Sequence, residues 1–524
     1  MQVTRSLAVA AGVVLAASAP ARGDGETSVS RSQSADAAKA NDLDLRLTLS
    51  SFLFRESGAD APAIVDQGAQ LENASPVKRY FGDLRAELQS AGLTLDARVR
   101  QTASQRFQSG ATGGGEYEIR TLSYRLGSKQ TSLTLGRQFI DSVGATKVDG
   151  LAFTQRVTKI LSTTLFAGAF PELGSRSLDT DYPRIRNVDG TEGSVIIPLT
   201  GGLGFAYQTP DYHGDVGIAA IYVPQAVPNA TSSESSRVFT TSSGYWRPGA
   251  KLDIYHFALL DVAGENHVAL TNGSLGIDAR PVTNVLFTAS VNHVSTDVLQ
   301  IATRNLLSDP DPTAIGIVQN NLAVIRVSQD LARAGASLAL AQQRFELSIS
   351  GGVHLRPAVS VPLADGSGSV AFPEARSADT TFTVLDRRSL GGLRASLSGS
   401  LTFPIGTKVP NRARGTVVRL AASRMFAQQR GQIEGDVTGL HFNDVDVSGG
   451  CMNSLNVFGC YGSSDTKAVQ AGALASWRVA REWLLLADVH VGYQDAHSTS
   501  ASGPVDWPRV YSVTAFTRVQ WRYR

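Results

Sequence analysis

The side chains that could act as nucleophiles, bases or metal ligands are scattered along this 524-residue sequence. No HExxH pair, GxSxG elbow or Walker-type phosphate loop occurs. The 8 histidines share no metal-ligand spacing and stand at His213, His256, His267, His293, His354, His441, His490 and His497. The sequence therefore predicts neither an enzyme nor a bound cofactor.

The remaining candidates for metal binding are acids in polar stretches and two cysteines. Three acidic stretches could offer oxygen ligands, but none completes the twelve-position EF-hand pattern, so we expect solvated loop acids: Asn443 with Asp444 and Asp446, Asp179 with Asp181, and Asp309 with Asp311. Cys451 and Cys460 lie in a polar stretch with only His441 near them and no second cysteine pair, which falls short of a tetrahedral metal site. We predict one loop-closing disulfide and no metal.

Arginine and histidine side chains recur on the polar faces of alternating segments. An arginine facing lipid at mid-bilayer would cost about 2 to 4 kcal/mol, so these side chains should face an aqueous lumen or an interface. The predicted pore-lining residues are Arg98, Arg100, Arg356, Arg394, Arg518, Arg522, His354 and His490. A row of guanidinium groups would favour anions, whereas Asp96, Glu346 and Asp488 on such faces would instead form a neutral ion-pair ladder.

The segments that carry these residues alternate with a period of two, as β-strands do. Clear examples are 93–100, 345–356 and 393–403, and many segments reach the roughly 9 to 11 residues that a tilted strand needs to cross a bilayer. We predict an all-β fold, a transmembrane antiparallel β-barrel of about 18 strands, within a range of about 16 to 20. Tight turns are expected near Gly127 and Ala480, and long loops at 173–192, 224–244, 295–321, 364–379 and 432–466.

The N-terminus and the composition fit export and a membrane of strands. Residues 1–21 have the layout of a cleavable signal peptide, 22–42 are a polar, flexible leader, and 43–524 form the barrel. No later stretch approaches the roughly 20 apolar residues of a spanning helix. The formal charge of +2 is too small to indicate a strongly charged partner, and we expect no nucleic-acid partner.

The last stretch, Arg509 to Arg524, reads as a closing strand, with Trp521 and Tyr523 on its apolar face. Together with the signal and the repeated alternation, including 133–173, this resembles bacterial outer-membrane β-barrels of the porin-like kind. The resemblance implies insertion into outer-membrane lipid by the barrel assembly machinery. Members usually end on an aromatic residue, whereas this sequence ends on Arg524.

The function that we predict is a passive or weakly selective outer-membrane channel for small hydrophilic solutes. Two alternatives stay open: a secretion conduit for polysaccharide that works with a separate periplasmic partner, and a plugged structural or enzymatic barrel. The solute and the oligomeric state do not follow from the sequence.

Overall fold

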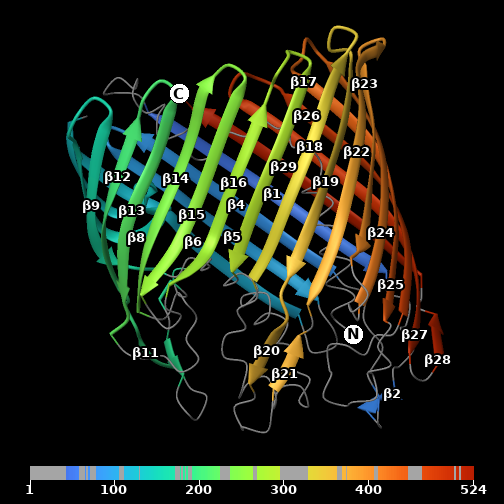
Figure 1. Cartoon of the computed structure of the whole chain (residues 1–524), viewed down its shortest axis with the longest axis horizontal. Helices are drawn as coiled ribbons and strands as arrows, with labels where there is room; N and C mark the ends of the chain where they lie inside the picture. The colour runs from blue at the N-terminus through green and yellow to red at the C-terminus, as the bar shows by residue number, and fades with distance from the viewer. Residues whose placement is uncertain are drawn as a thin grey trace.

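In the computed structural model most of the described chain forms one antiparallel sheet that closes on itself, and three small two-stranded sheets lie outside it (Figure 1). The structure describes residues 43–57, 65–66, 69–70, 78–105, 111–128, 130–171, 178, 181–182, 184–186, 192–224, 236–263, 268–295, 328–362, 369–372, 374–405, 411–446, 463–500, 503–506 and 509–523. The predicted signal peptide 1–21, the leader 22–42, and Cys451 with Cys460 lie outside these residues.

The barrel wall has 22 strands. The first half comprises β1 (Asp44–Ser57), β4 (Lys78–Ser90), β5 (Leu93–Gln105), β6 (Ala111–Gly127), β7 (Thr131–Ile140), β8 (Thr146–Arg156), β9 (Leu161–Ala169), β12 (Leu199–Gln208), β13 (Tyr212–Tyr222), β14 (Arg237–Gly249) and β15 (Leu252–Ala263). The second half comprises β16 (Ala269–Ala279), β17 (Val285–Ser295), β18 (Ser328–Leu340), β19 (Phe345–Arg356), β22 (Ala375–Leu390), β23 (Leu393–Pro404), β24 (Asn411–Phe426), β25 (Gly431–Asp446), β26 (Ser463–Arg478), β27 (Trp483–Ser500) and β29 (Val510–Tyr523).

The first and last strands close the barrel. β1 pairs with β4 on one side and with β29 on the other, in a register that places Leu45 opposite Tyr523 and Ser57 opposite Tyr511. The predicted all-β transmembrane barrel is therefore confirmed as a fold class, with 22 strands rather than about 18. Because this sheet has no free first or last strand, most of its backbone groups are paired within the sheet, as a membrane-spanning barrel requires.

The sequence predicted about 18 strands rather than 22 because the alternation of apolar and polar residues is weak on some strands. β25 occupies much of the predicted loop 432–466, and β14 covers part of the predicted loop 224–244. On β25, Gly435 and Gly439 occupy positions of the outer face where other strands carry large apolar side chains. Glycine gives no hydropathy signal there, so the segment reads as polar and irregular.

Two kinds of connection join the strands, at opposite ends of the barrel (Figure 1). One end carries short turns, among them those after Gly127 and around Ala480, as predicted. Two of these turns share the sequence Ala-Gln-Gln-Arg, at 341–344 and 427–430, and each places three successive residues at positive φ. The other end carries small hairpins such as β20 (Val359–Pro362) with β21 (Ser369–Phe372). Short turns are typical of the periplasmic side, so the second end faces outward from the cell.

The outer surface of the wall is apolar and bordered by aromatic rings. Large apolar side chains on one face of nearly every strand are solvent-exposed, for example Leu49, Leu165 and Leu420. Toward the short turns this face carries exposed aromatic residues, namely Tyr124, Trp246, Trp477, Trp483 and Tyr523. An apolar band with aromatic edges is what a bilayer requires of a barrel. No helix among the described residues is long and apolar enough to cross a membrane.

One hairpin leaves the wall and folds into the barrel. β7 pairs with β6 only as far as Arg137 opposite Leu122, and β8 pairs with β9 only from Asp149 onward. Beyond Arg137 and before Asp149, β7 and β8 pair only with each other and are joined by the short helix η2 (Asp141–Val143). Residues of η2 contact β12, β13 and β14, so we call 138–148 the inner hairpin.

Candidate functional site: the barrel lumen

The inner hairpin identifies the inner face of every strand. Ser142 and Val143 lie against Gly204 of β12 and Gly217 of β13, whose positions have no side chain to obstruct them. Directly paired residues of an antiparallel sheet share a face, so the registers carry this assignment around the barrel. Residues that share a face with Gly204 and Gly217 therefore line the lumen, and residues on the opposite face form the apolar outer surface.

Glycines permit the hairpin to bend inward. Gly136, Gly150 and Gly168 are direct neighbours across β7, β8 and β9. Gly136 has a φ of 108°, and a Cβ there would lie 2.2 Å from the carbonyl oxygen of Leu122. A Cβ on Gly150 would lie 2.2 Å from the carbonyl oxygen of Ala167. Only glycine fits where the backbones approach so closely, and at Gly136 the positive φ is a second reason for glycine.

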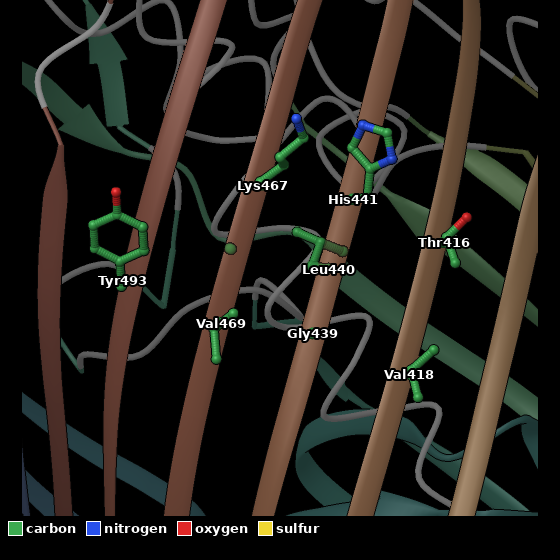
Figure 2. Close-up of a pocket in the computed structure, with 9 residues that line it drawn as sticks. Thr416, Val418, Gly439, Leu440, His441, Lys467, Val469 and Tyr493 are labelled. Carbon is green, nitrogen blue, oxygen red and sulfur yellow. The ribbon is translucent and has the colours of Figure 1, made fainter.

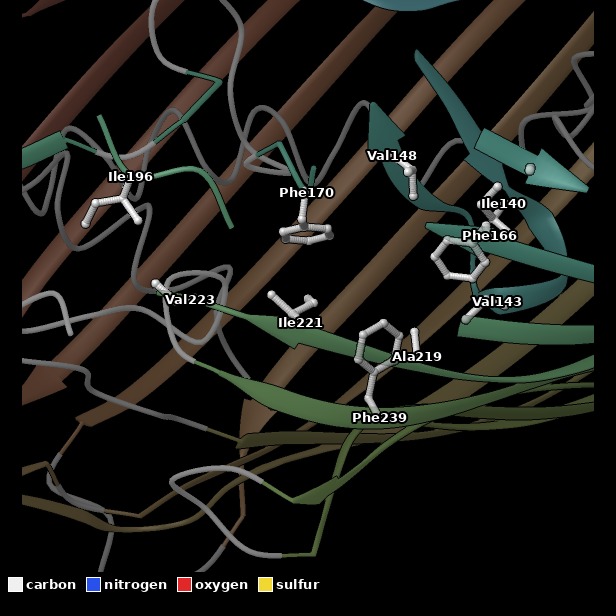
Figure 3. Packing of buried hydrophobic residues seen from close by; sticks show 11 residues of the cluster. Ile140, Val143, Val148, Phe166, Phe170, Ile196, Ala219, Ile221, Val223 and Phe239 are labelled. Carbon is white, nitrogen blue, oxygen red and sulfur yellow. The ribbon is translucent and has the colours of Figure 1, made fainter. Parts of the chain in front are cut away.

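Apolar side chains fill the lumen behind the inner hairpin (Figure 3). Val143 and Val148 are fully buried and pack with inward-facing wall residues such as Phe166 and Phe239. Phe170 and Ile196, from the connection between β9 and β12, complete this cluster. One sector of the lumen, along β7 to β9 and β12 to β14, is therefore packed like a protein core.

Next to this sector in the strand order, the inner faces of β4, β5 and β6, with Arg46 of β1, carry an alternating ladder of charges. Asp83, 7% exposed, hydrogen-bonds to the guanidinium groups of both Arg98 and Arg100, with the Arg100 Nε 3.0 Å away. Arg85 binds Asp96 through two bonds of 2.8 and 2.6 Å. The remaining members are Arg46, Glu87, Glu116, Glu118 and Arg120. The named members of the ladder are five arginines and five carboxylates, so the ladder is balanced by its own charges.

The registers place all eight predicted pore-lining residues on the inner face. Of the arginines, Arg98 and Arg100 share Asp83, and Arg522 binds Asp44 with distances of 3.0 and 2.5 Å. Arg518 lies over the ring of Phe516, with its Cζ 5.2 Å from the centroid.

Arg356 and Arg394 differ from the paired arginines. Neither forms a salt bridge within the described part of the chain, and the Nε of Arg356 is buried without a hydrogen-bond partner there. Arg394 is exposed near the short-turn end of β23. Like Arg518, which contacts the ring of Phe516, these two side chains have no carboxylate partner within the described residues.

The two predicted histidines each lie beside a carboxylate. The Nε2 of His354 is 2.9 Å from the Oδ1 of Asp379, whose other oxygen accepts a 2.5 Å bond from Arg333. The Nε2 of His490 lies 2.9 Å from the Oδ1 of Asp488 on the same strand. Neither arrangement includes a nucleophile; His354 is about half exposed, whereas the Nδ1 of His490 is buried without a hydrogen-bond partner within the described residues.

The sequence interpretation missed several charged residues of the lumen. Arg333 and Asp379 were not singled out, nor was Arg419, which contacts Glu434 at 3.2 Å and Asp436 at 3.3 Å. Glu434 and Asp436 alternate on β25, a signal that the two outward glycines of that strand concealed.

Of the acids that were expected to be solvated, Asp181 has a different role, and Asp179, Asp309 and Asp311 lie outside the described residues. Asp181 is 3% exposed and accepts a 2.5 Å hydrogen bond from Arg137. Asn443, Asp444 and Asp446 belong to strand β25. Among the described residues, no group of three or more His, Cys, Asp or Glu side chains is arranged to hold a metal ion.

The outer face carries one shallow depression, toward the outward-facing end (Figure 2). Val418, Gly439, Val469 and Tyr493 form one register row across β24 to β27, and a Cβ on Gly439 would meet no atom within 4 Å. Thr416, His441 and Lys467 form the adjacent row, with Asp465 contacting both His441 and Lys467. The rim therefore carries charges of both signs and gives no preference for a charged ligand.

A closed antiparallel barrel with an apolar, aromatic-edged outer surface and a charged interior is a transmembrane β-barrel of bacterial outer membranes. No family model and no curated protein matches this chain. Among solved structures it is similar to OccAB2 of Acinetobacter baumannii, with 9% identity, 93% of this chain and 100% of that chain covered, and a TM-score of 0.38.

Two further solved structures are similar at the same level. OccK5 (OpdH) of Pseudomonas aeruginosa has 10% identity, 93% and 100% coverage, and a TM-score of 0.37. A bacterial polysaccharide outer membrane secretin has 12% identity, 70% and 100% coverage, and a TM-score of 0.31. At these values the likenesses carry no argument about function, and the class assignment depends on the architecture of this chain.

Proposed function

We propose that this protein is a channel for the diffusion of small hydrophilic solutes across the outer membrane. Export would be directed by residues 1–21, and insertion would depend on the barrel assembly machinery. Permeation would need no covalent chemistry, because a solute would pass a wall of fixed charges and dipoles.

The observation that carries this proposal is the unequal filling of the lumen. The sector behind the inner hairpin is packed, whereas inner-face side chains elsewhere remain accessible to water, such as Arg394, Arg518 and Tyr255. A barrel filled by a plug would bury these side chains. Their exposure supports a water-filled path beside the inner hairpin.

The charge pattern supports weak rather than strong ion selectivity. The ladder on β4 to β6 is balanced by its own carboxylates, so it presents alternating dipoles more than a positive surface. Arg356 and Arg394, which form no salt bridge within the described residues, would supply a modest preference for anions.

Conductance across planar lipid bilayers tests the channel directly. We expect stepwise increases in current from purified protein, with a reversal potential in a salt gradient that indicates a slight preference for anions. Folding should be verified in the same preparation by the shift in gel migration on heating. A folded barrel that gives no conductance would overturn the proposal in favour of a closed barrel.

A further inference from the structure

The barrel wall has a seam where β6 loses its neighbour. Residues 111–121 of β6 pair with β5 on one side, and β7 pairs with β6 only from Leu122 onward. At this level the inner hairpin has left the wall. A strand edge beside hydrocarbon would leave backbone groups unsatisfied, which costs several kcal/mol for each group.

One guanidinium group occupies this seam. Arg137 donates from Nη1 to the carbonyl oxygen of Ile119 on β6 at 2.9 Å and to Asp181 at 2.5 Å. Its Nε and Nη2 donate to the two oxygens of Asp149 on β8, at 2.6 and 2.5 Å. The side chain is only 10% exposed. Arg137 thus joins the edge of β6, the base of the inner hairpin and the connection between β9 and β12.

The connection between β9 and β12 takes part in both the apolar cluster and the polar contacts around Arg137. Ile196 is buried in the apolar cluster, while its neighbours Val195 and Ile197 are exposed. Tyr182 of the same connection donates to Asp149 at 2.7 Å, and Asp181 lies 3.4 Å from the Nζ of Lys147. Polar side chains therefore gather at the seam, where Arg137 satisfies one backbone carbonyl of the β6 edge, that of Ile119.

We propose that Arg137 is the positioning residue that locks this seam and so holds the inner hairpin against the far wall, fixing the width of the lumen. This inference rests on the proposed channel function but concerns a separate feature. Four donors of one planar group serve three chain segments, a geometry that lysine cannot reproduce. Loss of the lock would let the inner hairpin detach from β12 to β14, because glycines at its base permit movement.

The test uses Val148→Cys, a substitution at a fully buried residue of the inner hairpin, in full-length protein with Cys451→Ser and Cys460→Ser. We expect slow reaction of Val148→Cys with a water-soluble maleimide. Adding Arg137→Met should raise the rate by at least about tenfold, since the hairpin would open more often. Arg137→Lys should resemble Arg137→Met. In bilayers, Arg137→Met should give larger and more variable current steps.

The matched control is Arg387→Met, which removes a lumenal arginine bound to Glu346 far from the seam. It should leave Val148→Cys protected. If Val148→Cys reacts with maleimide at the same slow rate with and without Arg137→Met, the proposal is overturned. It is also overturned if Arg387→Met raises the reaction rate as much as Arg137→Met does. If Arg137→Met does not yield a heat-modifiable barrel, Asp181→Asn serves the same comparison. Because labelling does not require current, this result is independent of whether the barrel conducts.

Discussion

Asp44 and Arg522, 478 positions apart in the sequence, form a two-point ion pair across the junction of β1 and β29. The pair lies on the inner face at the short-turn end, where the first and last strands of the barrel meet. It therefore adds side-chain bonds to the backbone ladder that closes the sheet. Both side chains remain about one-third exposed, which limits the stabilisation that solvent screening allows.

Arg522→Gln should weaken closure without preventing it. We expect the free energy of unfolding to fall by about 1 kcal/mol, because a partly exposed charge-assisted pair is lost while the backbone ladder remains. The temperature at which gel migration changes should fall by a few degrees. Arg518→Gln is the control, since Arg518 is on the same face but contacts the ring of Phe516. An equal fall in both variants would contradict a specific role for the pair.

Gly136→Ala should disrupt the inward bend of the hairpin. The new Cβ would lie 2.2 Å from the carbonyl oxygen of Leu122, at a φ of 108° that L-residues rarely adopt. The backbone would have to shift, at a cost on the order of 1 to 3 kcal/mol. We expect easier heat denaturation and altered conductance. Gly351→Ala, where the nearest atom lies at 3.4 Å, should leave both measurements near those of the unmodified protein.

The fold class could be predicted from the sequence because alternation survives wherever both faces carry typical side chains. On β29 the registers put Trp521 and Tyr523 on the outer face and Arg518 and Arg522 on the inner face, which follows from a period of two alone. On β25 the same period is present, but Gly435 and Gly439 remove the apolar half of the signal.

The seam could not be predicted, because its contacts join residues far apart in the sequence. Asp181 binds Arg137 across 44 positions, and nothing in the local sequence distinguishes Asp181 from a solvated loop acid. The glycines at 136, 150 and 168 are visible in the sequence, but their alignment depends on the registers of β7, β8 and β9. Long-range pairing therefore determines how the inner hairpin is held, which the local sequence does not show.

Asp83→Asn should shift the ion preference of the channel toward anions. The carboxylate compensates the charges of Arg98 and Arg100, so its removal leaves two neighbouring guanidinium groups facing the lumen. Reversal potentials in a salt gradient should move in the anion direction, and Arg394→Glu should move them in the cation direction. Unchanged potentials in both variants would place these residues away from the permeation path.

Asp141 should make the attachment of the inner hairpin dependent on pH. The Asp141 side chain is exposed, but its position inside the barrel reduces its solvation by bulk water, which raises the pKa of this carboxyl, and the nearby Asp215 carboxylate raises it further. The attached hairpin therefore holds a proton more tightly than a detached one, whose pKa is near 3.9. Attachment should strengthen as the pH falls through the raised pKa toward about 3.9 and weaken at neutral pH. Current fluctuations should thus decrease on acidification, and Asp141→Asn should keep them low at every pH. A pH dependence that persists in Asp141→Asn would assign it to another group, with Asp215→Asn as the next variant to compare.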